Sequence, residues 1–326
     1  MMRIGFLGVT VGLGGCLVLD PLLPFHNNIP CSEVNDETCN TDEYWDRVCL
    51  TCEEPYDWDR AYEWREKTIK DGATIRGIDP NLVSDVPFES NDGEAVLDAY
   101  FISAHGDVPE LSQTTILYNN GRFASIEHYL PRIQLLHELG ANLFVWDYRG
   151  YGKSLPETTP ESIDWMDDAR KAFEQAKLMA PDPNKIIVYG MSIGGFPAGE
   201  IADTKPVCAQ IFEASVVSIS EKVEENTSVM LPGSFLTSGV LETDIKLADT
   251  KNPTLILHGS NDYAISPASA LSFYDKLPNN IFKKLVLIEG AGHGLGDGGV
   301  PEAGFLDYQN ELMTFLGEGA PNCLAE

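Results

Sequence analysis

From about Leu82 to the end, the chain alternates two hydrophobic patterns. Short, almost continuous apolar runs of strand length are separated by stretches in which apolar residues recur every three or four positions. The first pattern predicts strands buried on both faces, and the second predicts amphipathic helices. The predicted strands are 95–102, 114–118, 143–146, 186–189, 207–212, 254–257 and 284–288. This alternation indicates an α/β fold with a mostly parallel central sheet and helices on both faces.

The clearest helical stripe has its apolar residues on one face, at Ile126, Leu130, Ile133, Leu136 and Leu139. A second stripe consists of Trp165, Ala169, Phe173 and Ala176. Thr159-Pro160-Glu161 predicts the start of that second helix, with proline at the first helical position. Ser266-Pro267 predicts the same kind of start for a helix over 268–277.

The region before the alternation has a different character. Residues 17–56 are acidic, carry cysteines and lack apolar periodicity. The apolar pattern over 57–70, in contrast, predicts a helix. Three of the five tryptophans, Trp45, Trp58 and Trp64, lie in this region. They either dock the leader onto the neighbouring domain or form a surface that stacks on carbohydrate or a partner.

The extreme N-terminus predicts an export signal. Arg3 precedes an uncharged run over 4–15 that is too short to span a bilayer easily. The run ends in Leu13-Gly14-Gly15-Cys16, which resembles the bacterial lipoprotein signal. That resemblance implies cleavage before Cys16, lipidation of its thiol and a lasting acyl anchor in the bilayer of the bacterial cell envelope, on the outer-membrane or periplasmic face. A plain signal peptide cleaved elsewhere and an uncleaved anchor are the alternatives.

The other six of the seven cysteines agree with export. An even number in an oxidising compartment is most simply three disulfides. Cys31, Cys39, Cys49 and Cys52 lie close together and are expected to pair among themselves. Zinc binding, with Cys49 and Cys52 as one ligand pair, and free thiols are the alternatives.

The remaining two cysteines, Cys208 and Cys323, lie far apart in the sequence, and we expect them to staple the C-terminus to the sheet.

The charge of the chain narrows the class of partner. There are 22 basic and 50 acidic residues, which gives a formal net charge of −28. Such a surface repels the phosphates of nucleic acids, so we expect no nucleic-acid partner.

A nucleophile motif follows the predicted strand 186–189. Gly190-Met191-Ser192-Ile193-Gly194 is G-x-S-x-G, and a helix-compatible stretch continues to Ala202. The strand–turn–helix setting makes the motif specific, because the serine must sit at a strained turn where larger neighbours would clash. Ser192 is therefore the candidate nucleophile.

A serine hydroxyl needs an adjacent base. Of the six histidines, only His293 lies in a glycine-flanked loop after the last strand. Asp262 follows the strand 254–257 and is the candidate acid that orients His293. Asp297 is a rival acid on another loop. His258 is interpreted as structural, and His128 and His137 as residues of a surface helix.

These motifs together resemble the α/β-hydrolase superfamily over roughly residues 82–316. The resemblance is strongest for small-capped members similar to serine aminopeptidases, prolyl oligopeptidases and acyl thioesterases. Besides Ser192, the resemblance rests on three segments: 147–154 after the strand 143–146, 257–262 around Asp262 and 291–294 around His293. The chain order Ser, Asp, His is the one this fold uses.

The resemblance also implies an oxyanion hole of backbone N–H groups. One comes from Ile193 and the other from Arg122 or Gly121, after the strand 114–118. This chain has Asn120 where the family usually has histidine, which leaves a backbone donor available. Asp147 and Tyr148 either stabilise their turn or bind a cationic substrate group.

These expectations divide the chain into four parts: a signal peptide (1–15), a tether with a cysteine-rich module and a docking helix (16–78), an α/β-hydrolase domain (79–318) and a tail (319–326). A short cap over 214–250 predicts an open site for a small-molecule or peptide acyl substrate. We expect a serine hydrolase of esters, thioesters or amides that needs no cofactor and no metal. A peptidase of the same fold and a catalytically silent surface-binding lipoprotein are the alternatives.

Overall fold

The computed structural model describes residues 67–68, 74–122, 125–154, 161–226, 237–294 and 299–325. The signal peptide, Cys16, the four clustered cysteines, the three tryptophans of the leader and Asp297 lie outside these residues. Among the described residues, no helix has both the length and the apolar composition needed to cross a membrane.

An eight-stranded sheet runs through the molecule in the order β12-β11-β10-β9-β7-β8-β6-β3. The strands from β12 to β8 are parallel, and β6 and β3 extend the sheet antiparallel. Their bounds are β3 (Val83–Asp85), β6 (Ala99–Ile102), β7 (Thr115–Asn119), β8 (Asn142–Trp146), β9 (Ile186–Met191), β10 (Ala209–Glu213), β11 (Thr254–Gly259) and β12 (Lys283–Ile288). Two small antiparallel pairs accompany the sheet, β1 (Lys67–Thr68) with β2 (Thr74–Ile75) and β4 (Phe88–Glu89) with β5 (Val96–Leu97).

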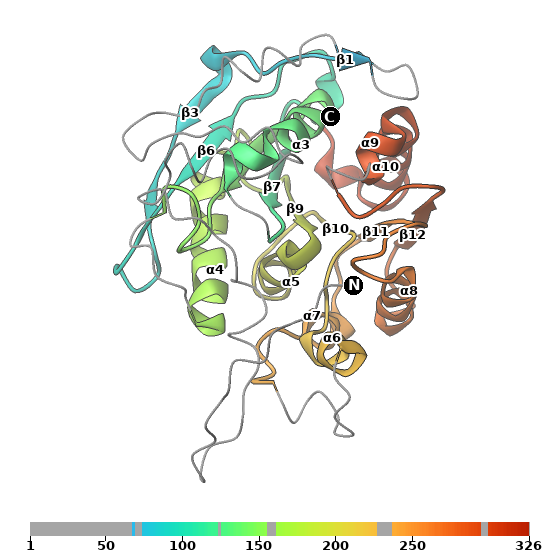
Figure 1. Ribbon diagram of the computed structural model, residues 1–326. Coiled ribbons are helices and arrows are strands. Elements are labelled where there is room, and N and C mark those ends of the chain that lie inside the picture. The colour runs from blue at the N-terminus through green and yellow to red at the C-terminus, as the bar shows by residue number, and fades with distance from the viewer. Residues whose placement is uncertain are drawn as a thin grey trace, which may run out of the picture.

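Helices cover both faces of this sheet (Figure 1). One face packs against α3 (Ile126–Glu138) and α10 (Phe305–Gly319), which follows the short α9 (Val300–Ala303). The other face packs against α4 (Ser162–Met179), α5 (Gly195–Thr204) and α8 (Pro267–Lys276). Two further helices, α6 (Ile219–Asn226) and α7 (Thr243–Lys246), lie between β10 and β11 in the sequence.

The two apolar layers explain why the strands read as continuous apolar runs. In β9, Ile187 and Tyr189 belong to the layer with α3 and α10, whereas Ile186 and Val188 belong to the layer with α4 and α5. Because side chains alternate between the faces of a strand, both faces are apolar only if nearly every residue is. The α/β fold with a mostly parallel central sheet, predicted from this pattern, is confirmed.

Several boundaries differ from the prediction. The run 95–102 is two strands, because the chain leaves one sheet at Asp98 and joins another: β5 pairs with β4, and β6 pairs with β8. Helix α8 begins at Pro267 as predicted, with Ser266 Oγ accepting from Ala268 N at 3.2 Å. Helix α4 instead begins at Ser162, after its N-cap Glu161, so Pro160 precedes the helix.

Two other expectations are wrong. The end of the helix predicted over 57–70 is a strand, since Lys67–Thr68 pairs with Thr74–Ile75. His137 is not at the surface: it is 2% exposed, and its Nε2 lies 2.8 Å from Ser103 O. The apolar stripe of α3 did not reveal that this neighbouring helical position is buried too.

The C-terminal residues are attached across the amino ends of the parallel strands. Cys208 and Cys323 form a disulfide, with their Cα atoms 5.4 Å apart. Lys185 Nζ donates to Leu324 O at 2.8 Å, and Ala325 N donates to Glu110 O at 2.7 Å. Ile78 and Ala320, which lie next to the boundaries predicted at 78/79 and 318/319, are fully buried.

Candidate active site

Ser192 lies in a sharp turn between β9 and α5. Its φ angle is +54°, and a single 3₁₀ turn over Ser192–Gly194 connects the strand to the helix. A positive φ costs a non-glycine residue roughly 1–3 kcal/mol and persists only where other contacts fix it. One such contact is the N–H of Val216, which donates to Ser192 O at 2.9 Å.

The glycines of the motif are required by the backbone around this turn. A Cβ on Gly190 would lie 2.5 Å from Gly194 O, and a Cβ on Gly194 would lie 2.1 Å from Asn119 O. Both obstacles are backbone atoms of buried segments, which cannot move aside as a side chain can. Glycine therefore lets the turn fold tightly against the end of β7.

Three candidate side chains meet at the carboxyl edge of the sheet. His293 Nε2 lies 3.0 Å from Ser192 Oγ, and His293 Nδ1 lies 2.8 Å from Asp262 Oδ2. Ser192 follows β9, Asp262 follows β11 and His293 follows β12. Because these strands are parallel, the segments after them leave the sheet at one edge.

The carboxylate of Asp262 is fully engaged. Its Oδ1 accepts from Ala264 N at 2.9 Å and Ile265 N at 2.8 Å, and its Oδ2 faces His293 and His258. Burial works to raise the pKa of Asp262, but the hydrogen bonds from His258, His293 and Ile265 hold it well below the ordinary value of 3.8. Asp262 is therefore ionised at neutral pH.

An ionised Asp262 sets the protonation of His293. A carboxylate accepts hydrogen bonds and cannot donate them, so Nδ1 of His293 carries the ring proton. Nε2 then presents its lone pair to the hydroxyl of Ser192. This is the arrangement in which an imidazole can take a proton from a serine.

His258 contacts the same carboxylate. It is 1% exposed, and its Nε2 lies 3.0 Å from Ile265 O and 3.2 Å from Asp262 Oδ2. Its interpretation as a structural residue beneath the site agrees with its burial, but the sequence reasoning missed its contact with Asp262. The spacing of four residues between His258 and Asp262 was the available signal.

The loop expected to form the oxyanion hole lies directly beside the serine. A Cβ on Gly121 would lie 3.3 Å from Ser192 Cβ and 3.2 Å from Met191 Sδ. Asn120 and Ile193 are buried, and Arg122 is partly exposed. Phe123 and Ala124, which continue the loop, lie outside the described residues.

Asp147 and Tyr148 face the protein interior. Both are fully buried; Asp147 Oδ1 accepts from Ile126 N at 2.9 Å, and Tyr148 OH donates to Asn120 O at 2.6 Å. These contacts favour the interpretation that the two residues stabilise local structure over the one in which they bind a cationic substrate group.

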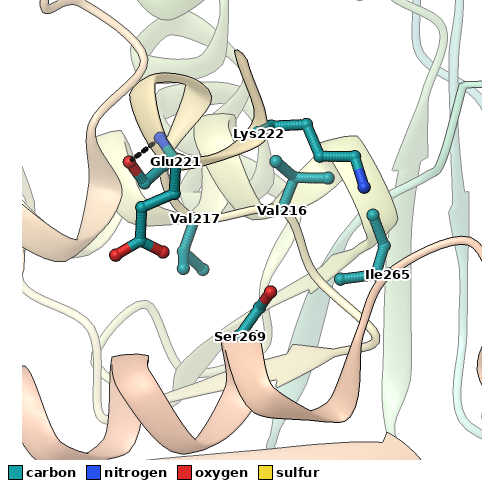
Figure 2. A pocket seen from close by; sticks show the side chains of 7 residues that line it. Val216, Val217, Glu221, Lys222, Ile265 and Ser269 are labelled. Carbon is teal, nitrogen blue, oxygen red and sulfur yellow. Dashed lines mark hydrogen bonds between the residues drawn. The ribbon is translucent and has the colours of Figure 1, made fainter. Parts of the chain in front are cut away.

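A small pocket lies beside the acid loop (Figure 2). Its lining residues come from the segment after β10, from α6, from the loop after Asp262 and from the start of α8, and are Val216, Val217, Ser218, Glu221, Lys222, Ile265 and Ser269. Lys222 Nζ donates to Ala264 O at 2.9 Å and so joins α6 to the loop after Asp262. The pocket contains none of the three candidate catalytic side chains.

Within the described part of the chain, no three His, Cys, Asp or Glu side chains are grouped so that they could hold a metal ion. The cysteines considered as zinc ligands, Cys31, Cys39, Cys49 and Cys52, lie outside that part.

Known proteins resemble this chain in sequence and in fold. The family model described as serine aminopeptidase, S33, matches residues 112–243, which include Ser192. The uncharacterised protein YfhR of Salmonella typhimurium is 28% identical over 202 residues, which are 59% of this chain and 68% of YfhR.

Solved structures of other proteins share the fold of this chain. The esterase Pf2001 of Pyrococcus furiosus has a TM-score of 0.56 at 20% identity, covering 73% of this chain and 93% of its own. Est1E of Butyrivibrio proteoclasticus, solved with ferulic acid bound, has a TM-score of 0.56 at 18% identity, covering 72% and 100%. The chain therefore has the fold of the α/β-hydrolase superfamily, and over the part that carries Ser192 it is similar to serine aminopeptidases of the S33 family.

Proposed function

We propose that the protein is a serine hydrolase that cleaves an acyl ester, thioester or amide through an acyl-enzyme intermediate. The observation that carries the proposal is the continuous chain of contacts from Ser192 Oγ through His293 to Asp262, at 3.0 and 2.8 Å. These residues are separated by 101 and 31 positions in the sequence. The similarity of the fold to the esterase Pf2001 supports the same reaction class.

In the first half of the reaction, Ser192 Oγ forms a bond to the acyl carbonyl carbon while its proton passes to His293 Nε2. The imidazolium is stabilised by the ionised Asp262. The backbone N–H groups of Ile193 and of Arg122 or Gly121 donate to the oxyanion that develops. When the tetrahedral intermediate collapses, His293 protonates the departing alcohol, thiol or amine.

In the second half, a water molecule replaces the leaving group. His293 takes a proton from the water, whose oxygen attacks the acyl-serine carbonyl. Collapse of this intermediate releases the carboxylic acid, and the proton on His293 returns to Ser192 Oγ.

A peptidase is the second candidate within the same chemistry. It is favoured by the match of residues 112–243 to the serine aminopeptidase family model. Turnover of short p-nitrophenyl acyl esters in preference to aminoacyl p-nitroanilides would favour the esterase, and the reverse preference would favour the peptidase.

The deciding experiment is labelling with a fluorophosphonate probe, which bonds to an activated serine. Wild-type protein should label, and Ser192→Ala should not label and should lose roughly 10⁴–10⁶-fold in kcat. Ser215→Ala is a matched control because Ser215 is as buried as Ser192, at 7% exposure each, and should still label. A folded wild-type protein that neither labels nor hydrolyses would instead support the silent, surface-binding lipoprotein.

The proposal extends to the place where the enzyme works. We infer from Leu13-Gly14-Gly15-Cys16 that Cys16 is acylated and anchors the protein in the bacterial cell envelope. Mass spectrometry of the mature N-terminal peptide tests this inference. Cys16→Ser should leave an unlipidated precursor about 15 residues longer, because a hydroxyl is a much weaker nucleophile than a thiolate. An unmodified mature peptide that begins elsewhere would contradict the anchor.

A further inference from the structure

The last residue of β8, Trp146, and the two residues that follow it hold the loop beside Ser192, between β7 and α3, at both of its ends. Trp146 Nε1 donates to Asn119 Oδ1 at 3.0 Å, and Tyr148 OH donates to Asn120 O at 2.6 Å. At the other end of the loop, Asp147 Oδ1 accepts from Ile126 N, the first N–H of α3, at 2.9 Å. The 146–148 segment therefore contacts the loop where it leaves β7 and where it enters α3.

The register of the sheet explains this arrangement. Strands β7 and β8 are parallel neighbours, with Tyr118 opposite Val145. The residues that follow these two positions therefore leave the sheet side by side. The 146–148 segment is also firmly held, since Ser154 Oγ donates to Asp147 O at 2.8 Å and Tyr151 N donates to Tyr148 O at 2.8 Å.

An ion-paired cluster fixes the next residue, Arg149. Its Nε and Nη2 donate to the two carboxylate oxygens of Asp168 at 3.0 and 2.9 Å, and its Nη1 donates to Asp92 at 2.8 Å. A bidentate arginine–carboxylate pair fixes orientation as well as distance. The support beneath Tyr148 is therefore rigid.

The carbonyl held by Tyr148 belongs to the peptide that links Asn120 to Gly121. The same carbonyl oxygen also lies close to the nucleophile turn, because a Cβ on Gly194 would lie 2.7 Å from Asn120 O. A peptide group is planar, with its oxygen and hydrogen on opposite sides. Fixing the direction of the Asn120 carbonyl consequently fixes the direction of the Gly121 N–H and the course of the chain into Arg122.

We propose that Tyr148 is a positioning residue for the oxyanion hole: its buried hydroxyl holds the Asn120–Gly121 peptide in the orientation that presents the loop's N–H groups to the reacting carbonyl. This inference rests on the proposed function and assigns a role to the Asp147-Tyr148 pair within it. Tyr148 acts on the reaction only through the peptide that it holds.

Burial keeps the hydroxyl in the required form. It raises the pKa of Tyr148 well above the ordinary value of 10.0, so the phenol retains its proton and remains a donor. Because the Asn120 carbonyl is buried with it, water cannot readily replace the hydrogen bond. Loss of the hydroxyl leaves the loop free to rotate this peptide.

The test is Tyr148→Phe, measured with a p-nitrophenyl ester and with a trifluoromethyl ketone that forms a tetrahedral oxyanion on the serine. Removal of a whole oxyanion donor costs about 10²–10³-fold in kcat. Here the donor remains but is less well oriented, so we expect kcat to fall by about 10- to 100-fold. The KM should change less than about threefold, and the ketone should bind more weakly by the same factor as kcat falls.

Tyr308→Phe is the matched control. Tyr308, on α10, is also fully buried, and its hydroxyl donates to Tyr189 OH at 3.1 Å. The Tyr308→Phe variant should unfold at a temperature lowered about as much as that of Tyr148→Phe. It should keep the wild-type kcat and the wild-type affinity for the ketone. All rates are expressed per active site titrated with the fluorophosphonate, so a poorly folded fraction cannot imitate the effect.

The outcomes separate this inference from the proposed function. An inactive, unlabelled wild-type protein would overturn the proposed function, and the role of Tyr148 with it. An active wild type with a Tyr148→Phe variant of unchanged kcat would overturn the role of Tyr148 alone. A fall in kcat with unchanged ketone affinity would also overturn it, since the defect would then lie outside the oxyanion hole.

Discussion

Two buried carboxylates stand at the carboxyl ends of neighbouring strands, and their partners differ in charge. Glu213 is the last residue of β10; it pairs with Arg132 of α3 and accepts a hydrogen bond from Tyr189 OH. Asp262, after β11, faces the rings of His258 and His293 and two backbone N–H groups. Glu213 and Arg132 are completely buried, whereas the cluster around Asp262 extends to Ser192 and to the partly exposed His293.

In the proposed reaction, this difference suits only one of the two carboxylates to assist proton transfer. Arg132 is permanently protonated and already compensates the charge of Glu213. A neutral His293 leaves the charge of Asp262 uncompensated until the imidazole gains a proton. The interaction therefore strengthens as the imidazolium forms, which is the requirement for stabilising a transition state. We expect mutations at Asp262 to affect activity and mutations at Arg132 to affect stability.

Among the variants at these two carboxylates, Asp262→Asn should have the largest effect on activity. An amide donates a hydrogen bond where the carboxylate accepted one, so it favours the wrong tautomer of His293. By analogy with a typical triad, kcat should fall about 10⁴-fold while the folded state persists. Steady-state hydrolysis and thermal unfolding measure the two effects. If Asp297→Asn causes this loss and Asp262→Asn does not, Asp297 is the acid.

The strand pattern and the edge of the sheet were predictable from the sequence for a physical reason. Strands buried on both faces must be apolar at nearly every position, so β7 and β9 stand out as runs. The ends of parallel strands meet at one edge, so residues after β9, β11 and β12 were expected to be neighbours. The strand break at Asp98 was not predictable, because both sides of it are equally apolar.

Contacts made by polar side chains were much harder to predict. Nothing in the local pattern of 143–148 indicates that Tyr148 reaches the carbonyl of Asn120 on another loop. The burial of His137 likewise depends on how α3 packs against the segment after β6, and the pairing of Arg132 with Glu213 depends on how α3 lies against β10. Such pairings depend on tertiary geometry, which hydrophobic periodicity does not contain.

Arg132→Met should lower the stability of the protein without a comparable loss of activity. It leaves Glu213 as a buried charge without its partner, and breaking such a pair costs about 3–5 kcal/mol of unfolding free energy. The kcat per titrated active site should stay within about threefold of wild type, because Arg132 is not one of the proposed catalytic residues. Removal of a catalytic side chain lowers kcat far more. Denaturant unfolding and active-site titration give the two values.

The double variant Arg132→Met, Glu213→Leu is the control for this prediction. It removes the uncompensated charge and should recover part of the lost stability, because apolar replacements of buried ion pairs are often neutral. A loss of activity as large as that of Asp262→Asn would contradict the division between the two carboxylates.

His258→Leu should have the smallest effect of these variants, because it leaves His293 in place and removes only one of the groups that hold Asp262. Losing the His258 hydrogen bond should raise the pKa of Asp262 toward 3.8. A carboxylate whose folded pKa is depressed adds stability that is present above its unfolded pKa and is lost as pH falls through the folded pKa. The wild type should therefore gain more stability than His258→Leu as pH rises from about 2 to 4, and kcat should fall about 10-fold in the variant.

His258→Gln keeps an N–H donor near the position of Nε2 and should recover most of both properties. Unfolding curves between pH 2 and 7, with hydrolysis at pH 7, decide the matter: equal acid sensitivity in all three proteins would mean that His258 packs beneath Asp262 without holding its charge.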